Sequence, residues 1–338
     1  MKALVALGLA AMIVFGALGC RQPAGPTGGL KVGIVYDKGG LGDKSFNDSA
    51  DRGVEKAKKE LGVDVVKIES KDVKDYESNL RELADNGCSL VFAIGFNMVE
   101  AVNTVAKEFP NTKFAIVDAE VDAPNVRSLK FKEEEGSYLV GYLAGLMTKT
   151  NKIGFIGGMN IDLIKKFEFG YKAGAEAANP KIQFVPSKYT GDWDNIDDAK
   201  VAANFMYNSG ADIIYHAAGR AGLGVIRAAA DNDKFAIGVD SDQDGEEPGH
   251  VLTSMIKHVD VAVYDTIKEL DDNDFKSGVR VFDLASGGVG ISDLQYTKDL
   301  IGKEKLDKLA AAQKQIVDGD VKVPSTEAEW QASHPASG

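Results

Sequence analysis

Short apolar strand patterns alternate with amphipathic helix patterns along most of this chain, from residue 31 to beyond residue 290. In the first half, strand patterns and helix patterns take turns at 31–36, 46–61, 63–68, 76–86, 90–94, 98–109 and 113–117, and another strand follows at 126–131. Consecutive strands that are joined through helices run parallel. The alternation therefore predicts an α/β fold with a parallel sheet that is covered by helices on both faces.

A nearly apolar helix pattern at 133–147 leads into a second series of the same kind. Its elements are expected at 153–156, 161–178, 182–185, 194–209, 212–216, 221–231, 235–239, 251–256 and 259–270. The two halves repeat an architecture but no sequence motif. We also expect short strands at 279–284 and 289–291, one long helix at 297–318 and a loosely held polar tail. A mature chain of about 310 residues is too long for one small core, so two domains are predicted.

The N-terminus has the pattern of a signal peptide. Met1 and Lys2 precede an unbroken apolar run that ends at Leu18-Gly19-Cys20, and the polar, Pro- and Gly-rich segment 21–30 follows. The run is too short for a comfortable membrane span. A small residue before a cysteine at its end resembles a bacterial lipoprotein signal, in which Cys20 becomes the lipidated first residue. Ordinary secretion with an incidental cysteine is the alternative.

The net charge and the small number of cysteines argue against several classes of function. The formal net charge of −12 argues against nucleic-acid binding and against a basic patch that docks on anionic lipid. Membrane attachment would therefore depend on Cys20. Cys88, the other cysteine, is expected to be a small buried residue. The two cysteines cannot build a zinc site alone, and the four histidines have no ligand spacing.

The segment from Asp37 to Asn47 is predicted to be the turn between the first strand and the first helix. Its glycines allow a sharp turn and a close approach of a ligand to the backbone. We expect Ser45 to cap the helix, which places Phe46 at the mouth of the turn. An ordinary turn whose phenylalanine packs into the core is the alternative reading.

Several other predicted strands also end in carboxylates or aromatic residues. Ligands of open α/β sheets bind outside the carboxyl ends of the strands. Two facing edges would form a cleft with two stacking surfaces, which suits a flat, neutral molecule with hydroxyl groups, such as a nucleoside or a sugar. The carboxylates would repel a phosphate. The strand-end residues are Asp37, Phe46, Asn47, Asp118, Trp193, Gly219, Asp240 and Lys257.

Three tempting motifs do not meet their requirements. The run from Gly39 to Ser45 has Asp43 where a phosphate-binding loop needs glycine. The run from Gly219 to Gly224 has the wrong glycine spacing for a dinucleotide site. The run that starts at Asp240 resembles a calcium loop, but its twelfth position is Val251. We therefore predict no cofactor, no metal and no catalytic residues.

Several separate motifs together resemble the basic membrane protein family, which includes the purine nucleoside receptor lipoproteins that serve ABC importers. The resemblance covers about residues 31–320. Its residues are Lys38-Gly39-Gly40, Ser45-Phe46-Asn47, Asp118, Gly141 to Gly145, Gly154 to Gly158, Phe169-Gly170-Tyr171 and Gly238-Val239-Asp240. The resemblance implies the type I periplasmic-binding-protein fold, in which two Rossmann-like lobes are joined by a hinge of three crossings.

The N-terminal signal pattern and the resemblance together imply boundaries along the chain: the first two segments follow from the signal pattern, and the lobes from the resemblance. Residues 1–19 would be the signal peptide and 20–30 a flexible tether. The first lobe would hold 31–129 plus 257–285. The second lobe would hold 130–256 plus 286–325, and 326–338 would be the polar tail.

The same resemblance assigns roles to the strand-end residues. Phe46 and Trp193 would sandwich a base, with Trp193 where the family has an aromatic residue, often Phe. Asp118 and Asn47 would bond the base edge. Ribose hydroxyls would be held by Asp240 and Lys257, with Asp37 and Gly219 nearby.

The resulting prediction is a lipid-anchored, extracytoplasmic nucleoside-binding protein that delivers its ligand to ABC permease and ATPase subunits. A binding protein for a sugar or another small signal is one alternative. A nucleoside hydrolase is the other, but it would need a tight carboxylate-rich metal site near the N-terminus. Asp37 and Asp43 are separated by too many glycines to resemble such a site.

Overall fold

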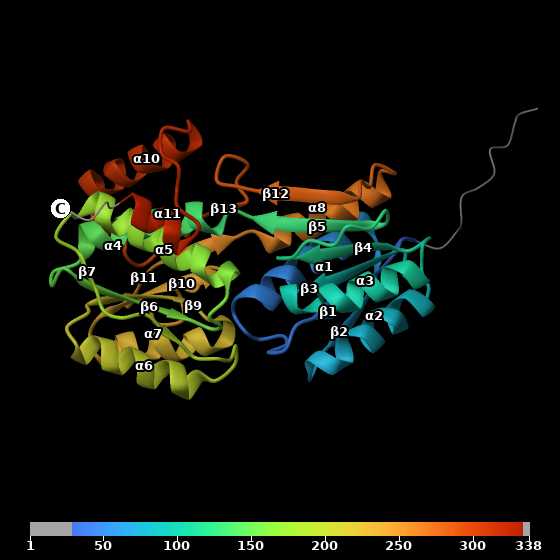
Figure 1. Ribbon diagram of the computed structural model, residues 1–338, viewed down its shortest axis with the longest axis horizontal. Coiled ribbons are helices and arrows are strands. Elements are labelled where there is room, and N and C mark those ends of the chain that lie inside the picture. The colour runs from blue at the N-terminus through green and yellow to red at the C-terminus, as the bar shows by residue number, and fades with distance from the viewer. Residues whose placement is uncertain (1–28, 334–338) are drawn as a thin grey trace, which may run out of the picture.

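The computed structural model describes residues 29–333, which form two lobes side by side, each built on its own sheet (Figure 1). The strands of the first sheet pair in the order β12-β5-β4-β3-β1-β2, and all these pairs are parallel. Their bounds are β1 (Lys31–Tyr36), β2 (Asp64–Glu69), β3 (Leu90–Ile94), β4 (Lys113–Val117), β5 (Val126–Phe131) and β12 (Gly278–Phe282).

The second sheet has the order β13-β11-β10-β9-β6-β7, with β8 also paired to β6, and β13 is antiparallel to β11. Its strands are β6 (Lys152–Gly157), β7 (Gln183–Phe184), β8 (Lys188–Tyr189), β9 (Ile213–Ala217), β10 (Phe235–Asp240), β11 (Val251–Lys257) and β13 (Val289–Ile291). The strand expected at 182–185 is instead two short edge strands, which lie on either side of Pro186. Proline has no N–H to donate to a sheet ladder.

Helices cover the sheets as the alternation predicts. The first lobe contains α1 (Phe46–Leu61), α2 (Tyr76–Asp85), α3 (Val99–Glu108) and α8 (Val259–Asp271), and the second contains α4 (Glu133–Met147), α5 (Asp162–Ala178), α6 (Ile196–Asn208) and α7 (Gly222–Asp231). Helix α4 is apolar on most sides because it packs between α5 and the strands β11 and β13. A Cβ on Gly141 would lie 2.0 Å from the carbonyl oxygen of Tyr171, so α4 and α5 touch through their backbones.

The C-terminal part of the chain corrects two expectations. The single helix expected at 297–318 is two helices, α9 (Lys298–Ile301) and α10 (Lys303–Val317), because Gly302 breaks it with a φ of 77°. The tail expected to be loosely held contains α11 (Glu327–Ala332). Its Trp330 ring lies 5.7 Å from the ring of Phe169, and its Nε1 donates to Glu176 at 2.8 Å. The aromatic contact fixes α11 on the second lobe.

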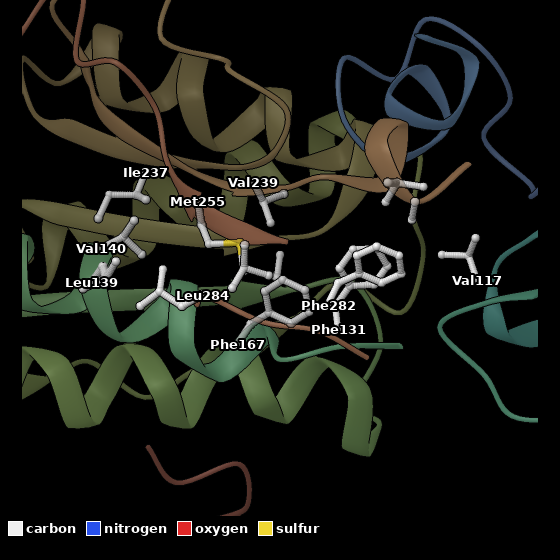
Figure 2. Close-up of a cluster of buried hydrophobic side chains, with 14 of the residues drawn as sticks. Val117, Phe131, Leu139, Val140, Phe167, Ile237, Val239, Met255, Phe282 and Leu284 are labelled. Atoms are coloured by element: carbon white, nitrogen blue, oxygen red, sulfur yellow. The ribbon is translucent and has the colours of Figure 1, made fainter. Parts of the chain in front are cut away.

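Within residues 29–333, the chain passes between the lobes at three places: from β5 to α4, from β11 to α8, and from β12 to β13. Strand β5 continues in the first sheet as far as Phe131. At the crossings, the rings of Phe131 and Phe282 stack at 5.1 Å, as Figure 2 shows. The N–H of His258 also donates to the carbonyl of Gly288 at 3.0 Å. The three crossings are therefore bonded to one another and form one compact hinge.

The predicted lipidation site Cys20, the signal peptide 1–19 and most of the tether 20–30 lie outside the described residues. Within residues 29–333, no helix has the length and apolar character needed to cross a membrane. Cys88 is buried, as the sequence predicts.

Candidate functional site

A cavity of about 640 Å³, counting the solvent space at its mouth, lies where the carboxyl ends of the two sheets face each other. All eight strand-end residues singled out from the sequence line it. The structure therefore brings together side chains that lie up to 220 positions apart (257 − 37 = 220). They are Asp37, Phe46, Asn47, Asp118, Trp193, Gly219, Asp240 and Lys257.

The turn before α1 is held by Asp43 and not by the predicted cap, Ser45. The Asp43 carboxylate accepts the backbone N–H groups of Ser45 at 2.9 Å, Asn47 at 2.8 Å and Asp48 at 3.1 Å. Ser45 makes no side-chain cap bond, so that prediction is wrong. Its hydroxyl donates instead to Asp240 in the other lobe. Asp43 satisfies the free N–H groups of the helix end, which releases Ser45 for this contact.

Asp37 and Asn47 are oriented by neighbours in the first lobe. The Asp37 carboxylate accepts from the hydroxyl of Tyr76 and from the N–H of Lys38 at 2.7 Å. Burial raises the pKa of Asp37, and the two hydrogen bonds oppose this rise without cancelling it. The Oδ1 of Asn47 accepts the N–H of Asp37 at 3.2 Å, which leaves its Nδ2 as the group that can donate to a ligand.

Asp118 follows β4 in a left-handed conformation, with a φ of 70°. Its Oδ1 accepts from the Nζ of Lys257 at 2.6 Å, and the same Nζ lies 3.1 Å from Oε1 of Glu133. Burial raises the pKa of Asp118, while Lys257 opposes the rise. Glu133 was not expected as a partner, because glutamates are mostly exposed to solvent. Lys257 was expected beside Asp240, but its direct partners are Asp118 and Glu133.

Asp240 ends β10 with a φ of 63°. Its Oδ2 accepts from the Ser45 hydroxyl, which belongs to the first lobe. Burial raises the pKa of Asp240 to about 6, and Lys257 acts through space to lower it. One oxygen of Asp240 and one of Asp118 are thus engaged by the protein, and the other oxygen of each can serve a ligand.

Aromatic rings form the walls of the cavity. Phe46 lines one side, and Trp193 lines the other in a loop of the second lobe. Trp193 rests on Gly158, where an added Cβ would lie 2.3 Å from its ring. Phe96 meets the Trp193 ring edge-on at 6.4 Å, and Phe167 also lines the cavity. Phe96 follows β3, so the strand-end rule could have found it, whereas Phe167 is on α5 and has no such signal.

Direct contacts across the mouth hold the lobes in a closed arrangement. Arg220 donates to the carbonyl of Leu41 at 2.7 Å, and Gln243 donates to the carbonyl of Lys44 at 3.1 Å. Lys38 pairs with Asp192 at 3.1 Å. The second lobe therefore contacts the first lobe directly through the glycine-rich turn that precedes α1.

The cavity presents carboxylates and an amide as hydrogen-bonding groups between apolar rings. Within residues 29–333, no group of three or more His, Cys, Asp or Glu is arranged to hold a metal ion. A ligand with hydroxyl or N–H donors and a flat ring would satisfy these groups.

Residues 30–327 match the model of the Bmp family, described as ABC transporter substrate-binding protein PnrA-like. The chain is 39% identical to the CD4+ T-cell-stimulating antigen of Listeria innocua, over 94% of this chain and 96% of the relative. It is 36% identical to the ABC transporter nucleoside-binding protein BmpA of Lactococcus lactis subsp. cremoris, over 96% of this chain and 98% of the relative.

A solved ABC transporter solute-binding protein from Aeropyrum pernix K1 superposes with a TM-score of 0.81 at 28% identity, covering 90% of this chain and 96% of that chain. The type I periplasmic-binding-protein fold expected from the sequence is thereby confirmed. The family consists of substrate-binding proteins and not of enzymes, and such proteins serve a permease and an ATPase. The chain therefore belongs to the Bmp family of ABC transporter substrate-binding proteins.

Proposed function

We propose that this protein binds a nucleoside, with a purine base, and presents it to an ABC importer. The observation that carries the proposal is the arrangement of the cavity: aromatic rings from both lobes face a space edged by carboxylates. The nucleoside-binding relative at 36% identity supports the same ligand class.

Each part of a nucleoside has a counterpart in the cavity. The base lies between Phe46 and Trp193, since stacked aromatic rings favour flat π-systems. Asn47 donates to an acceptor on the base edge through Nδ2, and Asp118 accepts from a base N–H. Asp240 accepts from ribose hydroxyls, and the third proton of the Lys257 ammonium donates to them.

The electrostatics favour a nucleoside over a nucleotide. Asp37, Asp118 and Asp240 are all buried at the cavity, and Lys257 is already shared between two carboxylates. A phosphate would add negative charge to a site that has a surplus of it. We therefore expect nucleosides to bind and their 5′-monophosphates to be rejected.

Isothermal titration calorimetry with purified protein tests this function. The panel is inosine, guanosine, adenosine, cytidine, the free bases, inosine 5′-monophosphate, ribose, glucose and galactose. Binding of a purine nucleoside, with weaker binding of its base and none of its monophosphate, is the expected result. Sugar binding without nucleoside binding would replace the proposal by the sugar-binding alternative. Release of free base from a bound nucleoside would favour the hydrolase reading.

We further propose that Cys20 carries the lipid anchor, because it follows Gly19 at the end of an apolar run. Replacing Cys20 by Ala should release the protein from membranes in a fractionation experiment and abolish the uptake of labelled palmitate. A membrane-bound Cys20→Ala protein, together with an unlabelled wild type, would show that the anchor is wrong.

A further inference from the structure

A row of charged side chains, buried except for the partly exposed Lys166, runs behind the cavity and through two hinge crossings. Nζ of Lys166 in α5 lies 3.0 Å from Oε2 of Glu133, the first residue of α4. Oε1 of Glu133 lies 3.1 Å from Nζ of Lys257, the last residue of β11. Lys257 then reaches Asp118 of the first lobe at 2.6 Å. The row thus links the second lobe, the hinge and the first lobe.

Glu133 is outside the set of residues that line the cavity and lies behind Lys257. Its two oxygens hold one lysine each, and its side chain is 1% exposed. Lys166 also donates to the carbonyl of Phe131 at 3.1 Å, which ties this end of the row to the first crossing. Glu133 therefore has no contact with a ligand in the cavity except through Lys257.

The Lys257 ammonium has little freedom to move. It is 1% exposed, and the rings of Phe46, Phe131 and Phe167 lie 5.0–5.7 Å from it. Figure 2 shows Phe131 and Phe167 in this buried layer. Because these rings surround much of the buried ammonium, the two carboxylates that it contacts, Asp118 and Glu133, decide where it sits.

We propose that Glu133 is a positioning residue for the ligand cavity: by sharing Lys257 with Asp118 at the hinge, it sets how firmly the cavity carboxylates hold their negative charge. Nothing in this sharing requires a particular ligand. Its consequence for affinity rests on the proposed nucleoside function.

The charged groups around the row decide the sign of the effect. Lys257 faces Asp118, Glu133 and Asp240. Lys166 faces Glu133 and, at 3.8 Å, Glu134. Asp240 also faces Asp118, Asp43 and the Ser45 hydroxyl. Asp37 also faces Asp118. These groups can respond when one charge of the row is removed.

Removing the charge of Glu133 and removing the charge of Lys166 should shift the pKa of Asp118 in opposite directions. Without the charge of Glu133, Lys257 acts more fully on Asp118 and Asp240 and lowers their pKa values. Without Lys166, Glu133 competes harder for Lys257, and the pKa of Asp118 rises. Burial already raises the pKa of Asp118, and both Lys257 and Lys166 counteract the rise. A purely structural role of Glu133 would not produce opposite signs.

The test is a carbon-13 NMR titration of the aspartate carboxyl groups in unliganded protein, with Asp118→Asn and Asp240→Asn spectra for assignment. Glu133→Gln should lower the titration midpoint of Asp118 by about one pH unit, and Lys166→Met should raise it by a similar amount. Glu135→Gln is the matched control. It removes the same charge from the same helix turn, where Glu135 pairs with Lys132 at 2.9 Å, and should leave the midpoint unchanged.

A shift of the same sign in both variants, no shift in Glu133→Gln, or an equal shift in the control would overturn the proposal. If Glu133→Gln does not fold, as judged by thermal unfolding, an unshifted midpoint in Lys166→Met overturns it instead. Calorimetry across pH adds a second readout. Glu133→Gln should change nucleoside affinity by on the order of tenfold and move the acid limb of binding to lower pH. A wild type that binds no nucleoside refutes the proposed function, while the titration still decides the role of Glu133.

Discussion

Asp118 and Asp240 occupy equivalent places in the two lobes and have partners of different kinds. Each lies at the carboxyl end of the third strand of its sheet from the hinge side, β4 or β10, and each has a left-handed backbone, with φ values of 70° and 63°. Asp118 is paired with an ammonium at the hinge. Asp240 is held by a hydroxyl from the opposite lobe.

The partner of Asp118 lies at the hinge, whereas the partner of Asp240 lies across the mouth of the cavity. Lys257 ends β11 at a crossing, where relative motion of the lobes is smallest, so we expect the Asp118 pair to be less sensitive to closure. Ser45 reaches Asp240 only when the first lobe lies against the second. The second-lobe carboxylate is thus the one whose environment changes on closure, and a ligand that bonds it favours the closed state.

Removing the shared ammonium should have the largest effect. Lys257→Met leaves the buried Asp118 without its cation and Glu133 with Lys166 alone. Breaking a buried pair in this way costs about 3–5 kcal/mol of unfolding free energy. Ser45→Ala removes one hydroxyl bond and should cost about 1 kcal/mol. Urea unfolding of the unliganded variants measures both. Equal losses would show that the two carboxylates are held alike.

The next effect concerns ligand selectivity. Asp240→Ala should weaken nucleoside binding by up to about 3 kcal/mol, because ribose hydroxyls would be left buried without a partner. Binding of the free base, which has no hydroxyls, should change little. Calorimetry with both ligands measures the two losses, and small-angle scattering should show reduced closure with nucleoside. Equal losses would mean that Asp240 does not contact the ribose.

The two aromatic walls provide a further comparison between the lobes. Phe46→Ala should weaken nucleoside binding by about 2 kcal/mol if the base stacks on this ring. The fluorescence of Trp193 can report the same binding event. Since the chain has two tryptophans, the indole emission of a Trp330→Phe variant would come from Trp193. A purine stacked on Trp193 should change that emission on titration. Unchanged affinity in Phe46→Ala would remove Phe46 from the ligand site.

The smallest effect is the pH dependence of Asp240. Because burial raises its folded-state pKa to about 6, above the ordinary value of 3.8, the folded protein binds more protons than the unfolded chain between these values. Its contribution to stability is therefore present at low pH and is lost as pH rises towards 6. The Asp240→Asn variant should lack this part of the change of unfolding free energy with pH, which is at most about 1.4 kcal/mol per pH unit. Unfolding curves of both proteins from pH 4 to pH 7 measure it.

Ligand binding should have the opposite pH dependence. A ribose hydroxyl donates to the ionised carboxylate, so nucleoside affinity should increase as pH rises through about 6 in the wild type. Asp240→Asn should remove this increase. Calorimetry at a series of pH values would contradict the assignment of Asp240 to the ribose if the wild-type affinity were flat between pH 5 and pH 7.

Sequence reasoning located the cavity residues because they obey a rule of backbone topology. In a parallel sheet, residues at the carboxyl ends of the strands meet at one edge, so the sequence alone groups Asp37, Asp118 and Asp240. Strand and helix positions followed from hydrophobic periodicity in the same way.

The partners of these residues were less accessible to sequence reasoning. Whether Ser45 or Asp43 holds the helix end depends on side-chain geometry within one turn, and both residue types are good caps. Glu133 reaches Lys257 only because two hinge crossings meet, which no local pattern encodes. The position of α11 depends on Trp330 finding Phe169, a contact between residues 161 positions apart (330 − 169 = 161).

Because the chain crosses between the lobes three times, the first lobe contains segments that are far apart in the sequence. This arrangement limits how early in synthesis the first lobe can fold. The N–H of Asp260 in α8 bonds the hydroxyl of Ser49 in α1, 211 residues earlier, and β12 completes the first sheet beside β5. The N-terminal lobe is therefore the first to be translated but cannot be finished until residue 282 has left the ribosome. Such long-range contacts make folding slow. A nascent chain that ends before α8 would expose the apolar face of α1 to chaperones or to aggregation.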